Sequence, residues 1–310
     1  MVKKYEQTGT EGVNPSFEGI DEWPADKALN ALLDEQIKSL NAVRAAIPQL
    51  AAAAEEAAQR LESSPDGRII YAGAGTSIRI GVQDGTELTP TFGWSQLRMA
   101  AVIAGGVRAL KQAVENAEDN PRSAAKRIAA LKLTPADVCI AVAASGVTPF
   151  TVAACRAARE AGALTISIAS NRDTELLQLA DYPIFLDTGA EPVAGSTRMN
   201  AGTAQKSVIN MLSTLIMVRL GRVHDGLMVN LIPTNAKLRE RAKAIVGQIA
   251  GCSTEDAALF LERARVAYNG LTDKNIKLAI LLAKGMDEKP AMRQLALHHD
   301  HLRPILNGLK

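Results

Sequence analysis

The chain has 310 residues, of which 47% are hydrophobic, which allows one large α/β domain or a domain with a smaller module. A formal net charge of +2 gives no field strong enough to favour nucleic acid as a partner. No run of 18 apolar residues predicts a membrane span, and no apolar stretch follows the N-terminal lysines as in a signal peptide, so a soluble, cytoplasmic protein is expected.

The N-terminal region changes character at Ala25. Residues 1–23 are polar with little periodicity and predict an irregular arm that could wrap the body or a partner subunit. From Ala25 to about Ser63, apolar residues recur at three- and four-residue steps, which predicts helix, and Pro48 marks a break or a new start. A second helix, rich in alanine and glutamate, is therefore expected from Gln49 to Leu61.

Five short apolar runs then follow, most of them separated by helical stretches. The runs are residues 68–75, 98–106, 137–146, 163–170 and 181–187, and the helical stretches are 107–119, 148–162 and 175–180. Continuous apolar strands that alternate with helices predict a doubly wound parallel sheet covered on both faces. In such sheets, ligands bind at the carboxyl ends of strands, near the switch in strand order.

The C-terminal third is predicted to be helical throughout. A long helix is expected within 195–221 and another within 231–246, followed by three short amphipathic segments at 253–264, 275–285 and 289–296. These segments predict a small three-helix module. The string "HHDH" at 298–301 lacks a suitably spaced Cys or Glu, so we interpret it as a polar helix face and expect no metal site. We expect the three cysteines to be buried free thiols in a reducing compartment. They are Cys139, Cys155 and Cys252.

Three loops that combine glycine with hydroxyl side chains precede predicted helices. They are Gly73–Ser77, Ala144–Pro149 and Gly195–Thr203. Helix N-terminal amides and free hydroxyls together favour a phosphate, although capping alone would explain any single loop equally well. No GK[ST] follows at P-loop spacing, and Ile78 stands where a dinucleotide fingerprint has its third glycine. The candidate binding residues are Gly75, Thr76, Ser77, Ser145, Gly146, Thr148, Ser196, Thr197 and Arg198. Arg198 could equally pair with a ligand carboxylate or with loop carbonyls.

Longer strings connect the chain to a known family. "AGAGTS" and "AASGVTPF" resemble the SIS domain, a fold that binds phosphorylated sugars. "GAGTSIRIGVQDGTELTPTFG", "AVENAEDN", "GSTRMNAGTAQKSVINMLST" and "GLMVNLIPTNAKLRERA" resemble the N-acetylmuramic acid 6-phosphate etherases, and "TEGVNP" and "GCSTEDA" fit as well. The string "GSTR..AGTAQK" is shared with the glucokinase regulatory protein group but not with SIS domains at large. The resemblance therefore covers nearly the whole chain.

The resemblance implies a fold and an activity. It implies a SIS domain at 60–225 after an N-terminal region at 1–59, and a ubiquitin-associated-like helical module within 226–310. It also implies a homodimer whose sites form near the interface. The implied activity is that of a lyase in peptidoglycan recycling, which converts N-acetylmuramic acid 6-phosphate to N-acetylglucosamine 6-phosphate and D-lactate. No cofactor or metal is expected.

The chemistry of this reaction requires two carboxyl groups. Ring opening gives an aldehyde that acidifies the proton on C2; a base removes this proton, the C3–O bond breaks, an acid protonates the lactyl oxygen and water adds at C3. The resemblance assigns the acid to Glu87 and the base to Glu118, with Glu115 as the fallback. Glu87 stands in an uncharged run, where burial is expected to raise its pKa. From the residues alone, a solvated acidic face is the favoured interpretation of Glu118.

The chain departs from the family at several positions. It has Val13 where the family usually has arginine, Asn200 where it has lysine, Ile78 where it has glycine, and Leu88–Thr89 where it has cysteine-proline. Ile78 is expected to reshape the pocket wall, and the absence of the two cations is expected to affect the strength of anion binding.

Two other functions stay open from the sequence. One is a sugar-phosphate-binding regulator like the glucokinase regulatory protein, although that protein is longer and has a second SIS domain. The other is a SIS-type aldose–ketose isomerase, which the "GSTR..AGTAQK" string disfavours. For the homodimer, residues 49–61 and 208–218 are expected to supply surplus apolar surface.

Overall fold

The computed structural model describes residues 9–309, which form two compact units. The first unit holds the described residues up to Gly85 together with Leu97–Ser213, and the second holds Thr86–Gln96 and the chain from Thr214 onward. The division at residues 60 and 226 expected from the sequence stays a prediction.

The N-terminal region has the expected arm and two helices. The described part of the arm contains three short 3-10 turns, Gly9–Glu11, Pro15–Phe17 and Ile20–Glu22, and the first eight residues of the predicted arm lie outside the described residues. Helix α1 spans Ala25–Ala45 and α2 spans Ile47–Ser63. Pro48 lies in the first turn of α2, where its missing N–H leaves no helical hydrogen bond unmade. The predicted pair of helices is confirmed.

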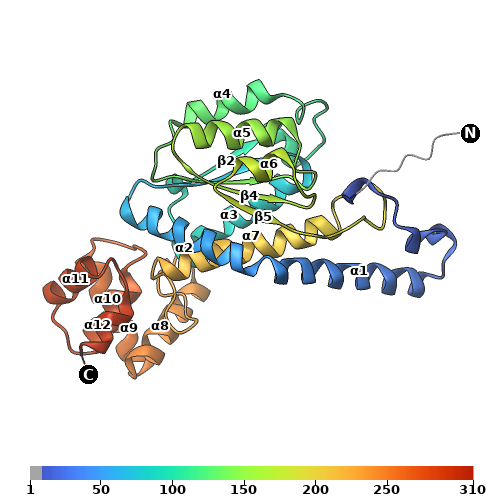
Figure 1. The fold of residues 1–310 in the computed structure, drawn as a ribbon. Helices are drawn as coiled ribbons and strands as arrows, with labels where there is room; N and C mark the ends of the chain where they lie inside the picture. Colours follow the sequence, from blue (N-terminus) through green and yellow to red (C-terminus); the bar gives the residue numbers. More distant parts are fainter. Residues whose placement is uncertain (1–8, 310) are drawn as a thin grey trace, which may run out of the picture. The chain divides into compact units, whose positions relative to one another are not determined.

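The first unit is built on a five-stranded parallel sheet, shown in Figure 1. The strands are β1 (Ile69–Gly73), β2 (Met99–Ile103), β3 (Val138–Val142), β4 (Leu164–Ala169) and β5 (Tyr182–Phe185). Their order is β2-β1-β3-β4-β5, and every neighbouring pair is parallel. All five predicted strands are present. The direction of winding reverses between β1 and β3, which is where this fold places its ligands.

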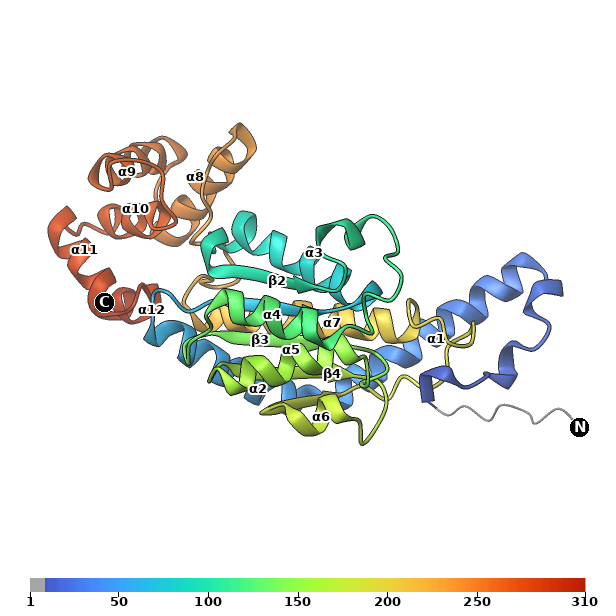
Figure 2. The same cartoon turned by 90° about the horizontal axis from the view of Figure 1, so that it is seen from above.

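Helices cover both faces of the sheet, so the predicted doubly wound fold is confirmed. Helices α4 (Pro121–Leu131), α5 (Pro149–Glu160) and α6 (Glu175–Leu179) lie on one face, onto which Figure 2 looks. Their core includes Ile70 and Ala72 of β1 with Phe150 of α5. Tyr71 points to the other face, as strand alternation requires.

On that other face, one buried carboxylate ties three elements together. Tyr71 Oη donates a 2.7 Å hydrogen bond to Oδ2 of Asp84 on α3 (Gly75–Phe92). Ser213 Oγ on α7 (Asn200–Arg219) donates to Oδ1 of the same carboxylate at 3.1 Å. Burial raises the pKa of Asp84, and these hydrogen bonds oppose that rise. Asp84 therefore fixes α3, which begins at the edge of the sheet where the strands end.

The connection between β2 and β3 differs from the prediction. The expected helix at 107–119 is a single 3-10 turn, Val107–Leu110, followed by turns in which Asn116 has a left-handed φ of 56°. The helix is instead α4, which begins at Pro121 and is capped by the Asn120 side chain accepting from Ser123 N at 3.0 Å. The Asn-Pro start outweighed the apolar spacing before it. Glu118 consequently lies in a loop and not on a helix face.

The two segments expected to supply a dimer surface are mostly buried within the chain. Ala53, Ala54, Ala57 and Leu61 of α2 are at most 1% exposed, and Val208, Ile209, Leu212 and Ile216 of α7 are fully buried. That expectation is wrong because both helices pack on their own subunit. Cys139 and Cys155 are buried free thiols and Cys252 is half-buried. Among residues 9–309, no helix combines the length and apolarity needed to cross a bilayer.

The second unit is largely a helical module. It contains α8 (Ala236–Ala250), α9 (Thr254–Ala267), α10 (Asn275–Ala283), α11 (Glu288–Leu297) and α12 (Leu302–Asn307), which share one apolar core. The three predicted short helices correspond to α9, α10 and α11, and α12 is an addition; the ubiquitin-associated-like arrangement stays a prediction. The predicted helix face at 298–301 is wrong, because His299 and Asp300 have left-handed φ values and form the turn between α11 and α12.

A lysine is buried in this module. Lys277 of α10 is 0% exposed, and its Nζ donates to the carbonyl oxygen of Asp300 at 2.5 Å. Burial lowers its pKa to about 7; the carboxylates of Asp300 and Asp273 oppose the shift, and Arg222 and Lys274 add to it. The fold therefore favours the neutral amine.

The shifted pKa of Lys277 predicts how stability depends on pH. Between about 7 and the ordinary value of 10.5, the unfolded chain binds the lysine proton and the folded chain does not, so stability rises with pH; below this window both states bind it. The gain is at most about 1.4 kcal/mol per pH unit. In urea unfolding, Lys277→Met should lose this rise and the exposed control Lys284→Met should keep it. Equal pH dependence in wild type and Lys277→Met would contradict the assignment.

Candidate functional site

One cavity of about 350 Å³ gathers most of the predicted binding residues at the switch between β1 and β3. It is lined by the loop after β1, the loop after β3, the loop before α4, part of the loop before α7 and the middle of the N-terminal arm. The lining residues are Glu11, Ala74, Gly75, Thr76, Ser77, Glu118, Asp119, Ala143, Ala144, Ser145, Val147, Thr148, Pro149, Gly195 and Thr197.

The loop after β1 turns sharply into α3. A Cβ on Gly73 would lie 2.7 Å from the carbonyl oxygen of Val142 in the neighbouring strand, so only glycine fits there. Gly75 has a left-handed φ of 53°, which glycine adopts at no steric cost. Thr76 and Ser77 follow in the first turn of α3, where hydroxyls and unpaired backbone amides favour an anion.

The loop after β3 forms the facing wall. Ser145 Oγ and Thr148 Oγ1 share a hydrogen bond of 3.1 Å, and Val147 N donates to Ser145 Oγ at 3.3 Å. Gly146 has a φ of 70°, and a Cβ there would lie 2.2 Å from Thr174 Oγ1. Gly146 is therefore a buried support of the loop and does not line the cavity.

Glu118 reaches the cavity through a backbone contact. The amide of Phe150, in the first turn of α5, donates to the carbonyl oxygen of Glu118 at 2.9 Å. This bond joins the loop before α4 to the start of α5, beside Ser145 and Thr148. The Glu118 side chain is exposed and lines the cavity with Asp119, whereas Glu115, the sequence-based fallback, does not line it.

The third predicted loop contributes less than expected. Gly195 and Thr197 line the cavity, but Ser196 and Arg198 do not. The amides of Asn200 and Ala201, at the start of α7, donate to the Glu191 carboxylate at 2.9 and 3.0 Å. Burial raises the pKa of Glu191, against these backbone hydrogen bonds. A side chain of the protein therefore occupies the helix N-terminus that the sequence offered to a phosphate.

Glu87 lies on α3 and is exposed, so the expectation that it is buried is wrong for the single chain. Buried positions on α3 recur at helical spacing, at Ser77, Ile78, Gly81, Asp84, Gly85 and Leu88. Glu87 falls on the opposite face, beside Thr86 and Pro90, which are also exposed. An uncharged run thus does not indicate burial when it lies on a helix surface. Glu87 does not line the cavity.

The departures from the family pattern also lie away from the cavity. Ile78 is 1% exposed and packs behind Gly73, so it forms core and not pocket wall. Val13 is 74% exposed. Asn200 is fully buried, and its Nδ2 donates to Glu35 Oε2 at 3.3 Å. A cation at position 200 would face Glu35, so its absence does not remove a charge from the cavity.

Glu11 and Asp119 are lining residues that sequence reasoning missed as site residues. Asp119 adjoins Glu118, and the same acidic string contained both. Glu11 lies in the string "TEGVNP", which fits the family but marks no site residue. Its place at the cavity depends on Thr10 N donating to Asn171 Oδ1 at 3.1 Å, between residues 161 positions apart. No local sequence signal encodes that contact.

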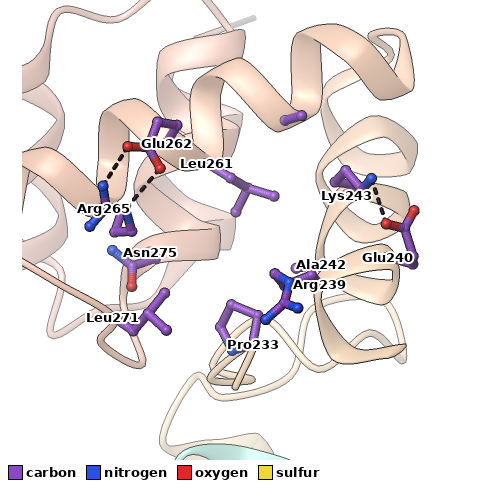
Figure 3. A pocket seen from close by; sticks show the side chains of 11 residues that line it. Pro233, Arg239, Glu240, Ala242, Lys243, Leu261, Glu262, Arg265, Leu271 and Asn275 are labelled. Atoms are coloured by element: carbon purple, nitrogen blue, oxygen red, sulfur yellow. Dashed lines mark hydrogen bonds and ion pairs between the residues drawn. The ribbon is translucent and has the colours of Figure 1, made fainter. Parts of the chain in front are cut away.

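A cavity of about 440 Å³ in the second unit has a different chemistry. Figure 3 shows Leu261 pointing into it, with the Glu262–Arg265 and Glu240–Lys243 pairs on opposite sides. Because no predicted site residue lines this cavity, the smaller cavity at the strand ends is the candidate site.

Comparisons with known proteins agree with the family resemblance of the sequence. Residues 49–159 match the glucokinase regulatory protein N-terminal SIS domain, and residues 110–215 match the SIS domain. An N-acetylmuramic acid 6-phosphate etherase from Deinococcus radiodurans is 43% identical over 96% of this chain and 94% of its own length. Etherases from Cutibacterium acnes and Enterococcus faecalis are 44% and 40% identical, over 82% and 94% of this chain and 83% and 94% of their own lengths.

Proposed function

The chain belongs to the N-acetylmuramic acid 6-phosphate etherase family, and on this premise we propose that it cleaves the D-lactyl ether of N-acetylmuramic acid 6-phosphate. The products are N-acetylglucosamine 6-phosphate and D-lactate. The unit built on its parallel sheet contains a SIS domain. The observation that carries the proposal is the cavity, where the carboxylate of Glu118 lies beside two hydroxyl-bearing loops at the strand ends.

The hydroxyl loops would hold the 6-phosphate. Thr76 and Ser77 offer hydroxyls and α3 amides on one wall, and Ser145 and Thr148 offer hydroxyls on the other. Uncharged donors of this kind suit a phosphate at helix starts. Among the described lining residues none is basic, so these donors carry the binding of the anion. Ser196 and Arg198, which the sequence predicted as binding residues, do not line the cavity and are not among these donors.

In the proposed mechanism, Glu118 is the base. In the open-chain sugar its carboxylate takes the proton from C2, and the electrons left behind form a C2–C3 double bond as the C3–O bond breaks. Glu87 donates a proton to the departing lactyl oxygen, and water then adds to C3. Glu87 is exposed on α3 of the single chain, so it is available to a site completed at a subunit interface.

The test of the function is direct. Incubation of the purified chain with N-acetylmuramic acid 6-phosphate should release D-lactate, measured with a D-lactate dehydrogenase assay, together with an equal amount of N-acetylglucosamine 6-phosphate. The unphosphorylated sugar is the control and should release far less. Absence of D-lactate at micromolar enzyme would contradict the proposal and leave a binding role.

The role of the loop after β3 can be tested separately. Ser145→Ala should weaken binding of N-acetylglucosamine 6-phosphate by about 10- to 100-fold in calorimetry, because one hydrogen bond to the charged phosphate is lost. Ser196→Ala changes a serine of the neighbouring loop that does not line the cavity, and it should leave affinity unchanged. Equal effects of the two substitutions on affinity would show that Ser145 does not bind the phosphate.

The homodimer is proposed to form through α1. Leu29, Leu33, Ile37 and Leu40 recur at helical spacing along this helix and are 44–66% exposed. A continuous aliphatic stripe on a soluble surface favours burial against a partner, and isologous pairing with a second copy would bury it on both subunits.

Sedimentation tests this interface. The chain should sediment as a dimer of 32.9 kDa subunits at micromolar concentration, and Leu33→Asp should give monomers, because a buried unpaired carboxylate opposes association. Leu259→Asp is the matched control, since Leu259 is 65% exposed on α9. A dimer that survives Leu33→Asp would move the interface away from α1.

A further inference from the structure

The middle of the N-terminal arm is fastened to the candidate site by one side chain. Asn171, just after β4, accepts from Thr10 N at 3.1 Å and donates to Thr10 Oγ1 at 3.1 Å and to the carbonyl oxygen of Ser145 at 3.2 Å. Thr10 is fully buried. Gly9, with a φ of 66°, passes so close that a Cβ there would lie 2.2 Å from Asn171 Oδ1. The arm therefore docks tightly against the loop that carries Ser145.

This docking puts the next residue, Glu11, at the cavity. A Cβ built on Gly195 would lie 3.2 Å from Glu11 Oε2, so the carboxylate lies against the loop before α7. Gly195 and Glu11 both line the cavity. Although Thr10 beside it is buried, Glu11 is exposed, and its carboxylate makes no hydrogen bond or ion pair with residues 9–309.

The chemistry of the cavity limits what Glu11 can bind. An ionised carboxylate only accepts hydrogen bonds, so it repels a phosphate and needs a donor. The part of an amino sugar phosphate away from the phosphate carries such donors, namely hydroxyls and the acetamido N–H. The hydroxyls and amides of the loops after β1 and β3 suit the anionic end. The two ends of the ligand are therefore matched by two different kinds of group.

We propose that Glu11 is a substrate-binding residue that accepts a hydrogen bond from a sugar hydroxyl or from the acetamido N–H, and whose charge keeps the phosphate on the hydroxyl loops. The proposal rests on the proposed function and deepens it, since it makes the arm part of the sugar site. The arm thereby selects for the sugar and orients it, and the loops select for the phosphate.

Calorimetry with two probes separates these roles. Glu11→Ala should bind N-acetylglucosamine 6-phosphate about 10- to 100-fold more weakly, the effect of losing a hydrogen bond to a charged group, while inorganic phosphate should bind equally or more tightly. Glu11→Gln keeps an acceptor oxygen and should lie between wild type and Glu11→Ala for the sugar phosphate. Glu18→Ala, a change of another exposed carboxylate of the arm, should match wild type with both probes.

Three outcomes would overturn the proposal. Unchanged sugar-phosphate affinity in Glu11→Ala would show that the carboxylate does not touch the sugar. An equal loss for both probes would show that the residue only maintains the cavity, and thermal unfolding would register the same damage. A wild-type chain that binds neither probe and releases no D-lactate would overturn the proposed function with it, a result visible before any variant is made.

Discussion

Replacing Glu118 by glutamine is expected to abolish both D-lactate release and exchange of the C2 hydrogen with deuterated water. Both steps need the base, and loss of a general base typically lowers the rate by about 10²–10⁴. Glu118 is exposed and is bound to the start of α5 only through its backbone, so the substitution should leave the fold and product binding intact. Exchange is measured by proton NMR on N-acetylglucosamine 6-phosphate.

Glu87→Gln is expected to fail differently. Without the acid, the lactyl oxygen leaves as an unprotonated alkoxide, so D-lactate release should fall by a similar factor. Because Glu118 is still present, C2 exchange should continue. Glu115→Gln is the control, since Glu115 does not line the cavity, and both activities should persist. If Glu118→Gln keeps C2 exchange, the base is another group; if Glu87→Gln keeps full lactate release, Glu87 is not the acid.

A methyl group at Gly146 is expected to disrupt the loop after β3. Alanine there must adopt a φ of 70° and would place its Cβ 2.6 Å from the Cβ of Thr174, so either the loop or α6 has to move. A strained backbone and a clash of this kind typically cost about 1–3 kcal/mol or more of unfolding free energy. Ser145 and Thr148 would be displaced with the loop, so affinity for N-acetylglucosamine 6-phosphate should fall by at least about tenfold.

Gly189→Ala is the matched control for that substitution. Gly189 has a comparable φ of 65°, but a Cβ there would meet nothing within 4 Å, and it does not line the cavity. It should lose only the smaller stability that a left-handed alanine costs, and its affinity for the sugar phosphate should match wild type. Equal losses of affinity in the two variants would show that close packing against Gly146 is not required to keep the loop after β3 in its binding position.

The sheet could be predicted because its information is local. Each of the five strands is a largely apolar run followed closely by glycine or a polar residue. The three central strands are buried throughout, as is typical of a parallel sheet covered on both faces. The prediction of a helix at 107–119 was wrong because other local signals outweighed the apolar spacing. Its apolar spacing suggests a helix, but the left-handed Asn116 and the Asn120–Pro121 start move the helix to α4.

The candidate site could be predicted where loops follow strands, and not where it depends on distant contacts. Thr76, Ser77, Ser145 and Thr148 come directly from two strand ends that the sheet brings together. Glu11 comes to the cavity through Asn171, and Glu191 takes the amides of α7. Neither pairing leaves a pattern in the sequence. The exposure of Glu87 depends on which face of α3 packs on Tyr71, which the uncharged run around it does not reveal.

The most direct test of the whole account is the position of solvent oxygen in the products. The chain is incubated with N-acetylmuramic acid 6-phosphate in ¹⁸O-labelled water, and both products are analysed by mass spectrometry. Elimination followed by addition of water breaks the C3–O bond on the sugar side, so the label should appear at C3 of N-acetylglucosamine 6-phosphate and the D-lactate should be unlabelled. Label in the lactate hydroxyl, or no lactate at all, would contradict the account.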